Sequence, residues 1–472
     1  MREGEGSIAW RDGSVWSGAP PHPPATLSRH SADVVVIGAG VTGMLAATML
    51  AHDGADVLVV DRHAVGGVAT RNSTAKISAL QGTKYSEVAA RRSPEVATAY
   101  GAAQLDAVAG LRALIAGLGI DCRFTDAPAF TYATEPASAE VAFREYEAAR
   151  DAGLSVQWVT ETELPFPVLG AVRLGDQAHF DPLAFCRGLA TALGTGHVAE
   201  HTAVREVVED ADGCRVSIDR DVRLACDHVV VATQGPISDP ALLANRCTPM
   251  QSYAIAARLP GDVPEGLYLS CDTRVRSLRP VLTPGGVDAV VGGEGHPIGE
   301  GEATPRRWDA LAEWTRDHFG SAEVTHRWAT HDLVPTDHVP FVGRLAPRSK
   351  RRWVATGFAK WGMTNGYVAA NVISEAIGGR DVSWASTFDS CRIAPSVNRD
   401  LISIGKSAVT HLLVDRVRHP ALPRCTHQGC VLRYDDALNT WDCPCHGSRF
   451  SADGAVVQGP AVSPLAEGPP AP

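Results

Sequence analysis

Two short boxes near the carboxyl end of the chain combine cysteine and histidine at spacings suited to a metal. The first box covers residues 425–430 (CTHQGC), and the second covers residues 443–448 (CPCHGS). Each box offers one thiolate and one imidazole within a single loop. Two thiolates and two imidazoles can hold a zinc ion, or a [2Fe–2S] cluster in which both imidazoles bind the same iron.

The pairing of the boxes favours the iron–sulfur cluster over zinc. Fifteen residues separate His427 from Cys443, so each Cys–His pair comes from a loop of its own. Two neutral imidazoles in place of thiolates reduce the negative charge of the cluster and raise its reduction potential. The hydroxyl of Ser448 can donate a hydrogen bond to a sulfur and tune that potential further. We therefore expect a Rieske-type [2Fe–2S] centre.

Two further cysteines of the boxes, Cys430 and Cys445, remain in matching positions. They could form a disulfide that ties the loops together, or all four cysteines could compete for a zinc ion. Eleven cysteines in 472 residues are too few for a disulfide scaffold. The other seven are scattered, as expected for buried thiols in a reducing compartment: Cys122, Cys186, Cys214, Cys226, Cys247, Cys271 and Cys391.

A glycine-rich turn near the amino end has the context of a dinucleotide-binding βαβ unit. The apolar strand Asp33–Ile37 leads directly into residues 38–43 (GAGVTG), and Met44–Leu50 continues as an apolar helix. A second apolar strand, Val57–Val60, ends at the acid Asp61. This order of strand, GxGxxG turn, helix, strand and acid predicts that the chain binds a dinucleotide.

Each residue of this turn has a physical role in the prediction. Gly38 permits the tight turn, Gly40 lets a pyrophosphate approach the backbone, and Gly43 lets the helix pack closely on the strand. The helix N-terminus offers free N–H groups and partial positive charge to the phosphates. Asp61 is placed to accept hydrogen bonds from ribose hydroxyls.

Later segments favour FAD over NAD as that dinucleotide. The strand Trp353–Ala355 leads into a second glycine-rich turn, residues 356–366 (TGFAKWGMTNG), and the apolar helix Tyr367–Ile377 follows. FAD enzymes use such a second turn, far along the chain from the first, to hold the flavin end. Residues 66–76 form a small polar loop that could also contact the cofactor, with a plain surface loop as the alternative. The sequence contains no second GxGxxG turn for a nicotinamide cofactor.

The remaining elements must position these two sites. The length predicts two or three domains. Helical periods over Pro94–Leu118 and Ser138–Ala152, and short strands after Cys247, suggest a substrate domain inserted into the nucleotide domain. We therefore expect an α/β dinucleotide-binding domain with an inserted antiparallel α+β substrate domain. The resemblances given below further imply an FAD-binding fold of the Rossmann-like, glutathione-reductase type and a small all-β Rieske domain. The expected boundaries are an N-terminal arm (1–30), a FAD-dependent oxidoreductase domain (31–385, with insertions near 85–175 and 245–330), a linker (386–408), the Rieske domain (409–466) and a tail (467–472).

Charge and hydropathy restrict the partners. A net charge of −10 and a pI near 5.9 argue against nucleic acid or an anionic membrane, because both require a basic face. Residues 1–30 have no apolar run of the kind found in signal peptides. The only long uncharged stretch, Val34–Ala51, is better explained by strand, turn and helix than by a membrane span. We expect a cytoplasmic protein without a membrane span.

The two boxes resemble those of Rieske proteins of the disulfide-bearing respiratory type. The resemblance implies four cluster ligands and one disulfide: Cys425, His427, Cys443 and His446, with Cys430 bonded to Cys445. The domain is short by this comparison, because residues 409–423 leave room for only one or two strands before the first box. Either the cluster-binding lobe rests on the FAD domain, or it is poorly supported and its cluster is exposed.

The rest of the chain resembles the glycine/D-amino-acid-oxidase-like FAD family, and most closely its bacterial members with a fused C-terminal Rieske domain. The motifs VVVIGAGVTG, STAKIS, HFDPLAF, TRVRSLRP, DLVPTDHVPFVG and ATGFAKWGMTNG follow that family's order, from about Ser14 to Leu465. Residues 66–70 depart from the family's usual GxTG pattern. The resemblance implies FAD contacts from Gly38, Gly40, Gly43, Asp61, Thr74, Ala75, Lys76, Val204, Gly357, Trp361, Gly362 and Thr364.

This combination predicts a FAD-dependent oxidoreductase that oxidises a small organic substrate such as an amine or an amino acid. The flavin would take a hydride and pass single electrons to the Rieske centre, from which a separate carrier protein would accept them. An alternative is a redox-transfer or sensing protein that a partner protein reduces, without a small-molecule substrate. A NAD(P)H reductase is a third hypothesis, for which a second nucleotide site is missing.

Residues that contact the substrate have no comparable motif. Their candidates come from residue type and position alone: Arg276, Arg279, Trp361, Tyr253, Glu294 and His296. An arginine pair suits a carboxylate, an aromatic ring could form a wall of the flavin pocket, and an acid with a histidine could transfer protons. For each of them, a structural role in the core or on the surface is at least as good an explanation.

Overall fold

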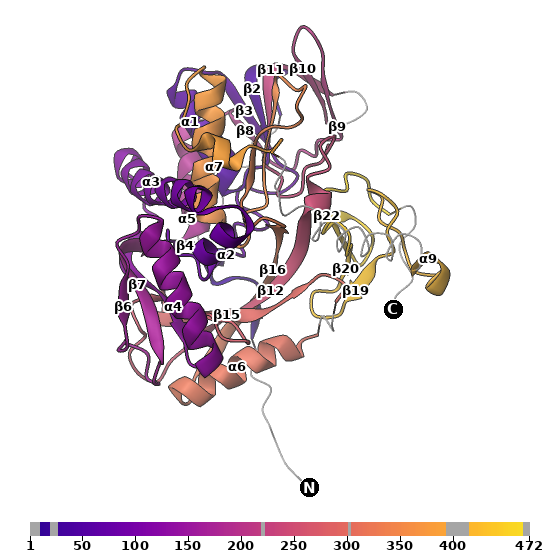
Figure 1. Ribbon diagram of the computed structural model, residues 1–472. Helices are drawn as coiled ribbons and strands as arrows, with labels where there is room; N and C mark the ends of the chain where they lie inside the picture. The colour runs from indigo at the N-terminus through magenta and orange to yellow at the C-terminus, as the bar shows by residue number, and fades with distance from the viewer. Residues whose placement is uncertain (1–9, 19–26, 219–221, 301–303, 393–414, 466–472) are drawn as a thin grey trace.

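The computed structural model describes residues 10–18, 27–218, 222–300, 304–392 and 415–465, which form three sheets (Figure 1). The first sheet is largely parallel and has the order β17-β18-β11-β2-β3-β8, with β10 and β9 extending it beside β11. Its strands are β2 (Ser31–Ile37), β3 (Val57–Val60), β8 (Val198–Ala199), β9 (Glu206–Glu209), β10 (Cys214–Ser217), β11 (Arg223–Val231), β17 (Phe341–Arg344) and β18 (Arg352–Thr356). Because β2 is paired in parallel with both β3 and β11, its apolar run Val34–Ile37 is buried.

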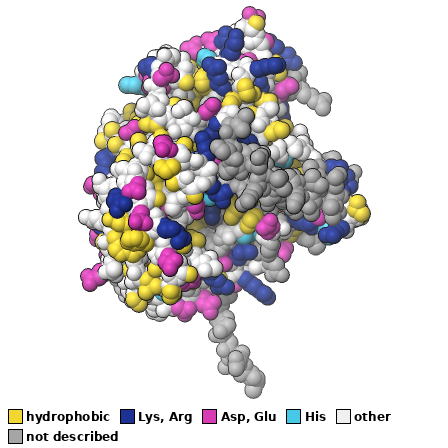
Figure 2. All heavy atoms as spheres, in the orientation of Figure 1, with side chains coloured by type: hydrophobic (Ala, Val, Ile, Leu, Met, Phe, Trp, Pro, Cys, Tyr) yellow, Lys and Arg dark blue, Asp and Glu magenta, His cyan; other side chains and the backbone are white. Residues whose placement is uncertain are grey.

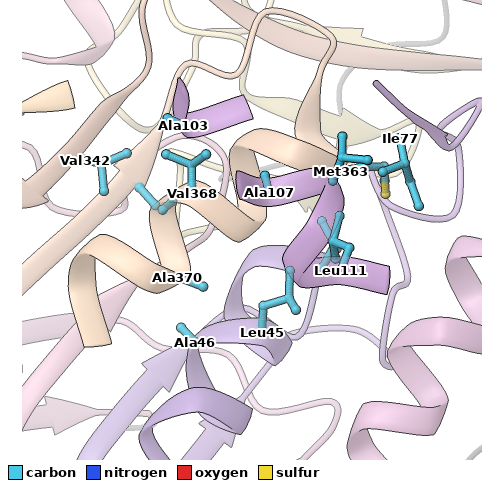
Figure 3. Close-up of a cluster of buried hydrophobic side chains, with 14 of the residues drawn as sticks. Leu45, Ala46, Ile77, Ala103, Ala107, Leu111, Val342, Met363, Val368 and Ala370 are labelled. Carbon is cyan, nitrogen blue, oxygen red and sulfur yellow. The ribbon is translucent and has the colours of Figure 1, made fainter. Parts of the chain in front are cut away.

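Three helices hold the two glycine-rich turns in one core. Helix α1 (Val41–His52) follows β2, α7 (Gly362–Ile377) follows β18, and both α1 and α3 (Pro94–Leu118) pack on α7. Small side chains, among them Ala46, Ala107 and Ala370, lie where the helices approach one another in Figure 3. The two turns are therefore fixed relative to each other, although more than 300 residues separate them in sequence.

The second sheet is mainly antiparallel and has the order β1-β16-β12-β15-β14-β13-β5-β7-β4, with β6 beside β7. Its strands are β1 (Arg11–Asp12), β4 (Lys76–Ile77), β5 (Thr125–Ala133), β6 (Gln157–Val159), β7 (Gly170–His179), β12 (Cys247–Arg258), β13 (Leu267–Ser270), β14 (Arg276–Thr283), β15 (Gly286–Pro297) and β16 (Glu323–Pro335). The other helices of this part are α2 (Lys84–Arg91), α4 (Pro136–Asp151), α5 (Pro182–Leu193) and α6 (Arg306–Phe319). The inserted antiparallel α+β domain is thus confirmed.

The third sheet is a small antiparallel meander, and we call residues 415–465 around it the cluster lobe. Its strands are β19 (Arg433–Asp435), β20 (Thr440–Asp442), β21 (Arg449–Ser451) and β22 (Val456–Gln458), and the short helix α9 (Asp415–Arg418) precedes them. Figure 1 shows this lobe in yellow against the long strands β12 and β16. The expected small all-β domain is present, and it packs on the flavin part of the chain.

Two segments that we expected outside the flavin domain contribute to it. In the expected N-terminal arm, β1 pairs with β16, and Trp16 of the short helix η1 (Val15–Gly18) is buried. In the expected linker, η3 (Ala385–Phe388) places the ring of Phe388 in the core, and Arg392 pairs with Asp337 at 2.8 Å. The rest of that linker, residues 393–408, lies outside the described residues.

One described helix, α3, is long and apolar enough to cross a membrane by length and composition. Its buried side chains, including Tyr100, Ala103 and Leu111, belong to the core shared with α1 and α7. The stretch Val34–Ala51, the membrane-span candidate of the sequence, instead divides into β2, a turn and α1.

Candidate functional site

A cavity of about 680 Å³ opens at the carboxyl ends of the parallel strands. Residues from β2, β3, β18 and the segment just after β11 line it on one side, and residues from β12, β14, β15 and β16 line it on the other. A crevice at the carboxyl ends of a parallel sheet is the usual ligand site of α/β folds. The cavity therefore lies between the nucleotide part and the inserted domain.

The first glycine-rich turn has the close contacts that only glycine permits. Gly38 has φ +113°, and a Cβ there would lie 2.5 Å from the carbonyl oxygen of Ala232. A Cβ on Gly43 would lie 1.8 Å from the carbonyl oxygen of Gly38. Helix α1 begins after Gly40, which has no side chain to cap it, and the hydroxyl of Thr70 accepts a hydrogen bond from Val41 N at 3.0 Å. The helix start thus faces the cavity as a dinucleotide pyrophosphate requires.

The carboxylate of Asp61 lies at the edge of this turn. It accepts hydrogen bonds from the backbone N–H groups of Ala39 and His63, both at 2.6 Å. Burial raises the pKa of Asp61, although the two N–H donors and the nearby His63 oppose that rise. The carboxylate is thereby held beside the cavity, with lone pairs remaining for a ribose hydroxyl.

The second glycine-rich turn lies opposite the first. Gly357 has φ +77°, and a Cβ there would lie 2.6 Å from Pro335. Ala359 and Lys360 also have positive φ, of 49° and 73°, and the backbone N–H of Lys360 donates to the carboxylate of Asp332. This compact turn brings the start of α7 to the cavity wall. A helix start there suits the electron-rich edge of a flavin.

The cavity wall contains nine of the twelve residues expected to contact FAD: Gly38, Gly40, Asp61, Thr74, Lys76, Val204, Gly357, Trp361 and Gly362. Gly43, Ala75 and Thr364 do not line it. Gly43 packs α1 on β2, Ala75 takes a left-handed φ of 53° between two lining residues, and the Thr364 hydroxyl accepts a hydrogen bond from Gln81 at 3.0 Å. These three residues support the wall from behind.

Lys76 is a buried cation of the wall without a carboxylate partner among the described residues. Its ammonium group donates to the hydroxyl of Ser277. Burial and the nearby Arg279 lower the pKa of Lys76 to about 7. Arg279, a candidate substrate residue, does not line the cavity, because its guanidinium group lies behind Lys76 against His179 (2.5 Å) and the carbonyl of Phe180 (3.1 Å).

Four other substrate candidates, Arg276, Tyr253, Glu294 and Trp361, line the cavity, whereas His296 does not. Arg276 and Glu294 pair at 2.6 Å, so the guanidinium group is already bound to an acid. The Glu294 carboxylate also lies 4.0 Å from Arg307. The guanidinium group of Arg307 lies over the ring of Tyr253, 5.7 Å from the ring centroid. The expected pair of arginines free for a carboxylate is therefore not assembled here.

The two boxes of the cluster lobe bring their donors together. The Cys425 and Cys443 thiols are hydrogen-bonded, which together with a bond from Ser448 lowers the pKa of Cys425 to about 7. The rings of His427 and His446 lie 5.1 Å apart, and the Nδ1 atom of each is buried without a hydrogen-bond partner. Burial lowers the pKa of both imidazoles, which favours the neutral form that binds a metal. Two adjacent thiols and two unpartnered imidazole nitrogens fit a [2Fe–2S] cluster.

The leftover cysteines form the Cys430–Cys445 disulfide. The sulfurs of Cys430, Cys443 and Cys445 lie within 4.8 Å of one another, a spacing that would also suit a metal. Because two of the three are bonded to each other, they cannot act as thiolate ligands. The zinc alternative with four thiolates therefore does not fit this arrangement.

The cluster lobe also closes the flavin cavity. Val457, Gln458 and Gly459 line that cavity, and Gln458 donates a hydrogen bond to the side chain of Gln234 at 2.7 Å. The Nε2 atom of His63 lies 2.7 Å from the carbonyl oxygen of Val457. The lobe is thus a wall of the flavin site.

The wall of the flavin cavity meets the second cluster box directly, with no room for a water molecule between them. His446 and Gly447 lie on one side of this contact and Gln234, His331 and Asp332 on the other, and the last three also line the flavin cavity. Glycines allow close contact here, since a Cβ on Gly447 would lie 3.1 Å from Pro249. The two sites are therefore separated by one layer of side chains.

A buried charged network fixes the lobe in this position. Arg449 donates to both carboxylate oxygens of Asp442, at 2.8 and 2.7 Å. It also contacts Gln251 at 2.6 Å and His331, both on strands of the inserted domain. Burial alone would lower the pKa of Arg449, but the attraction and hydrogen bonds of Asp442, together with the attraction of Asp435, outweigh it and raise that pKa. The flavin part thereby supplies the support that the short lobe lacks.

Sequence reasoning missed the residues of this interface. Gln234, Gln251 and His331 lie on the flavin side, and Asn245 of the short helix η2 (Ala244–Arg246) hydrogen-bonds to His446 at 2.7 Å. His331 directly precedes the DLVPTDHVPFVG motif, which we recognised only as a family signature, and is not part of it. Nothing in the spacing of these residues marks them as neighbours of a metal box.

Two family models match the chain in the order that the structure shows. A FAD-dependent oxidoreductase model matches residues 33–376, and a Rieske [2Fe–2S] domain model matches residues 415–469. Together with the cavity and the donor set, these matches define a flavoprotein with a fused iron–sulfur lobe. The chain belongs to the FAD-dependent oxidoreductase family, and its cofactors are FAD and a Rieske [2Fe–2S] cluster.

Known proteins share this architecture in whole or in part. The Rieske 2Fe-2S iron-sulfur protein YhfW of Bacillus subtilis is 27% identical over 94% of this chain and 95% of its own length. The cytochrome b6-f complex iron-sulfur subunit of Gloeobacter violaceus is 52% identical over 42 residues, 9% of this chain and 23% of that protein. The structure of glycine oxidase from Geobacillus kaustophilus superposes on 77% of this chain and over 100% of its own chain, with a TM-score of 0.66 and 19% identity. L-amino acid deaminase from Proteus vulgaris (TM-score 0.63, 18% identity) covers 81% of this chain with 98% of its own.

Proposed function

We propose that this oxidoreductase oxidises a small amine or amino acid in the flavin cavity and that its electrons then pass to the cluster within the same chain. One observation supports the transfer above all others: Val457–Gly459 of the cluster lobe line the flavin cavity, and His446 lies beside residues of that cavity's wall. FAD, when bound, accepts two electrons with a hydride, and the cluster accepts them one at a time. A cytoplasmic location belongs to this proposal, as does a carrier protein that removes the electrons.

The lining of the inserted domain supports a small substrate with a basic nitrogen. Glu294 lies between Arg276 (2.6 Å) and Arg307 (4.0 Å), so its carboxylate neutralises one of these two positive charges. Tyr253, Trp361 and Phe358 add aromatic surface, which suits the cationic or neutral end of an amine. The fold relatives glycine oxidase and L-amino acid deaminase act on compounds of this class, as their names state.

The residues of this chain would position the reactants and exclude water. The starts of α1 and α7 would hold the phosphates and the flavin edge of the cofactor, and Asp61 would hold its ribose. Lys76 is a buried cation of the cavity wall without a neutralising acid among the described residues, so it can stabilise negative charge developing in the cavity. The cluster lobe shields the opposite side from solvent.

A panel of amines and amino acids, added without oxygen, tests the proposal. We expect at least one compound to bleach the flavin absorbance. In freeze-quenched samples, an EPR signal of the reduced cluster should then grow while the flavin is partly reoxidised. Bleaching only by a redox partner protein would instead favour a transfer or sensing role.

A variant without the cluster is the control. In Cys443→Ser, the same compound should bleach the flavin, which should then stay fully reduced because its acceptor is missing. Partial reoxidation of the flavin in this variant at the wild-type rate would contradict transfer to the cluster.

A further inference from the structure

The two imidazoles of the cluster site differ in their surroundings. His446 is 2% exposed, and its Nε2 atom faces the side chain of Asn245 in the flavin part. His427 is partly exposed, and its loop neighbours Thr426 and Gln428 are exposed. An electron from the flavin would therefore reach the cluster from the His446 side. Among the described residues, the His427 side is the one open to another protein.

The surface around the His427 loop is basic, although the chain as a whole carries a net charge of −10. Arg424 precedes the first ligand directly and is exposed. Arg416 of α9 donates to the carbonyl of Gly429 in the first box at 2.9 Å, which places α9 against the cluster loop. Arg418 at the end of α9 is exposed as well.

An exposed apolar side chain lies within this basic surface. Val417 of α9 is 83% exposed. Figure 1 places α9 at the outer edge of the lobe, away from the flavin sheets, and Figure 2 shows Lys and Arg side chains with a hydrophobic one at that edge. An apolar contact ringed by cations is the anatomy of a docking surface.

The described acids of the lobe do not cancel these charges. Asp415 is buried and pairs with Arg433 at 2.7 Å, and Asp435 and Asp442 are buried in the network with Arg449. The exposed acids of residues 415–465 are Asp436 and Asp453, in the two hairpin turns of the sheet. The His427 side is therefore a local positive patch on an acidic protein.

We propose that residues 416–418, Arg424 and the His427 loop form the docking surface for a small acidic one-electron carrier protein. The inference rests on the proposed function, because it supposes that the cluster receives electrons from the flavin. In the step itself the reduced cluster loses one electron and the carrier gains one, with no bond made or broken. Opposite charge steers such a carrier to the exposed imidazole and away from the flavin cavity.

Two copper or haem carriers of similar size and opposite charge test the surface. The protein is reduced with dithionite and desalted, the cluster is quantified by EPR, and its reoxidation is followed by stopped flow with acidic plant plastocyanin or with basic cytochrome c. The double variant Arg418→Glu, Arg424→Glu should lower the plastocyanin rate by roughly tenfold or more and raise the cytochrome c rate. The wild-type plastocyanin rate should fall as salt is added.

Arg144→Glu provides the matched control, because Arg144 is an exposed arginine on α4, at the other side of the molecule from the lobe (Figure 1). It makes the same charge change and should leave both rates unchanged. A full cluster signal with equal effects of the double and control variants would overturn this inference alone. A missing cluster signal in the wild-type protein would overturn the proposed function, and this inference with it.

Discussion

The side-chain oxygen of Asn245 lies 2.7 Å from the Nε2 atom of His446, across the interface between the flavin part and the cluster lobe. The Nδ1 atom of the same imidazole is buried and unpartnered, as a ligand atom must be before it binds iron. Nε2 therefore carries the proton and donates it to Asn245. The side chain of one domain thus orients a ligand of the other.

Two substitutions of Asn245 should move the reduction potential of the cluster in opposite directions, because one strengthens the hydrogen-bond acceptor and the other removes it. Because the oxidised cluster carries one more positive charge, a stronger acceptor at Nε2 stabilises it, and a lost acceptor destabilises it. Asn245→Asp should lower the potential, and Asn245→Leu should raise it by roughly 40 mV, which corresponds to about 1 kcal/mol for one electron. EPR-monitored redox titration measures both, and shifts of the same sign would contradict the assigned hydrogen bond.

Arg449→Met should loosen the lobe. The substitution leaves Asp442 buried without its partner, which costs about 3–5 kcal/mol for a buried ion pair. We expect urea to release the cluster absorbance at a lower concentration, and a protease to cut the lobe faster. Arg433→Met removes the partly exposed Arg433–Asp415 pair and should shift the urea midpoint much less. Equal shifts in the two variants would argue against a special role of the network.

Gly43→Ala should abolish FAD binding through packing alone. Its Cβ would lie 1.8 Å from the Gly38 carbonyl oxygen, so α1 must move away from the first turn. Gly117→Ala is the matched change, because Gly117 lies in α3 with no heavy atom within 4 Å of an added Cβ. That variant should gain roughly 0.5–1 kcal/mol from helix propensity. Flavin absorbance after purification and the melting temperature distinguish the two results.

The charge of Lys76 should control anion binding near neutral pH. Its pKa of about 7 means that it is positive below that pH and neutral above it. Benzoate binding, followed by the change in flavin absorbance, should weaken in the wild-type protein as the pH rises through about 7. Lys76→Arg keeps its charge and should bind benzoate on both sides of that pH, whereas Lys76→Met should bind it weakly throughout. A pH step that survives in Lys76→Met would exclude Lys76 as its origin.

The sequence predicted those parts of the site whose chemistry is local in the chain. The GAGVTG turn with Asp61, the second turn at Gly357 and the two metal boxes each combine residues that are close in sequence, so spacing alone indicates their geometry. The three-sheet architecture followed from the same reasoning, because strand and helix periods are local as well. For this reason most of the predicted FAD residues line one cavity.

The interface was beyond the sequence because its contacts join distant residues of ordinary type. Gln251, His331 and Asn245 form hydrogen bonds that span 80 to 201 positions, and no periodicity encodes such pairs. Residue type alone also led to the wrong expectation that Arg276 and Arg279 form a free pair for a substrate carboxylate. A free arginine and one that is paired with Glu294 or packed behind Lys76 look the same in a sequence.

The position of Val457–Gly459 in the cavity wall has a consequence for biosynthesis. The other wall residues end at Met363, 94 positions before Val457, so the newly made chain has a flavin pocket that lacks one wall until the last part of the chain is made. FAD can enter from that side until the C-terminal lobe folds over it. Cofactor loading and closure are then successive events, and a protein that closes before FAD arrives would have to open this interface again to accept it.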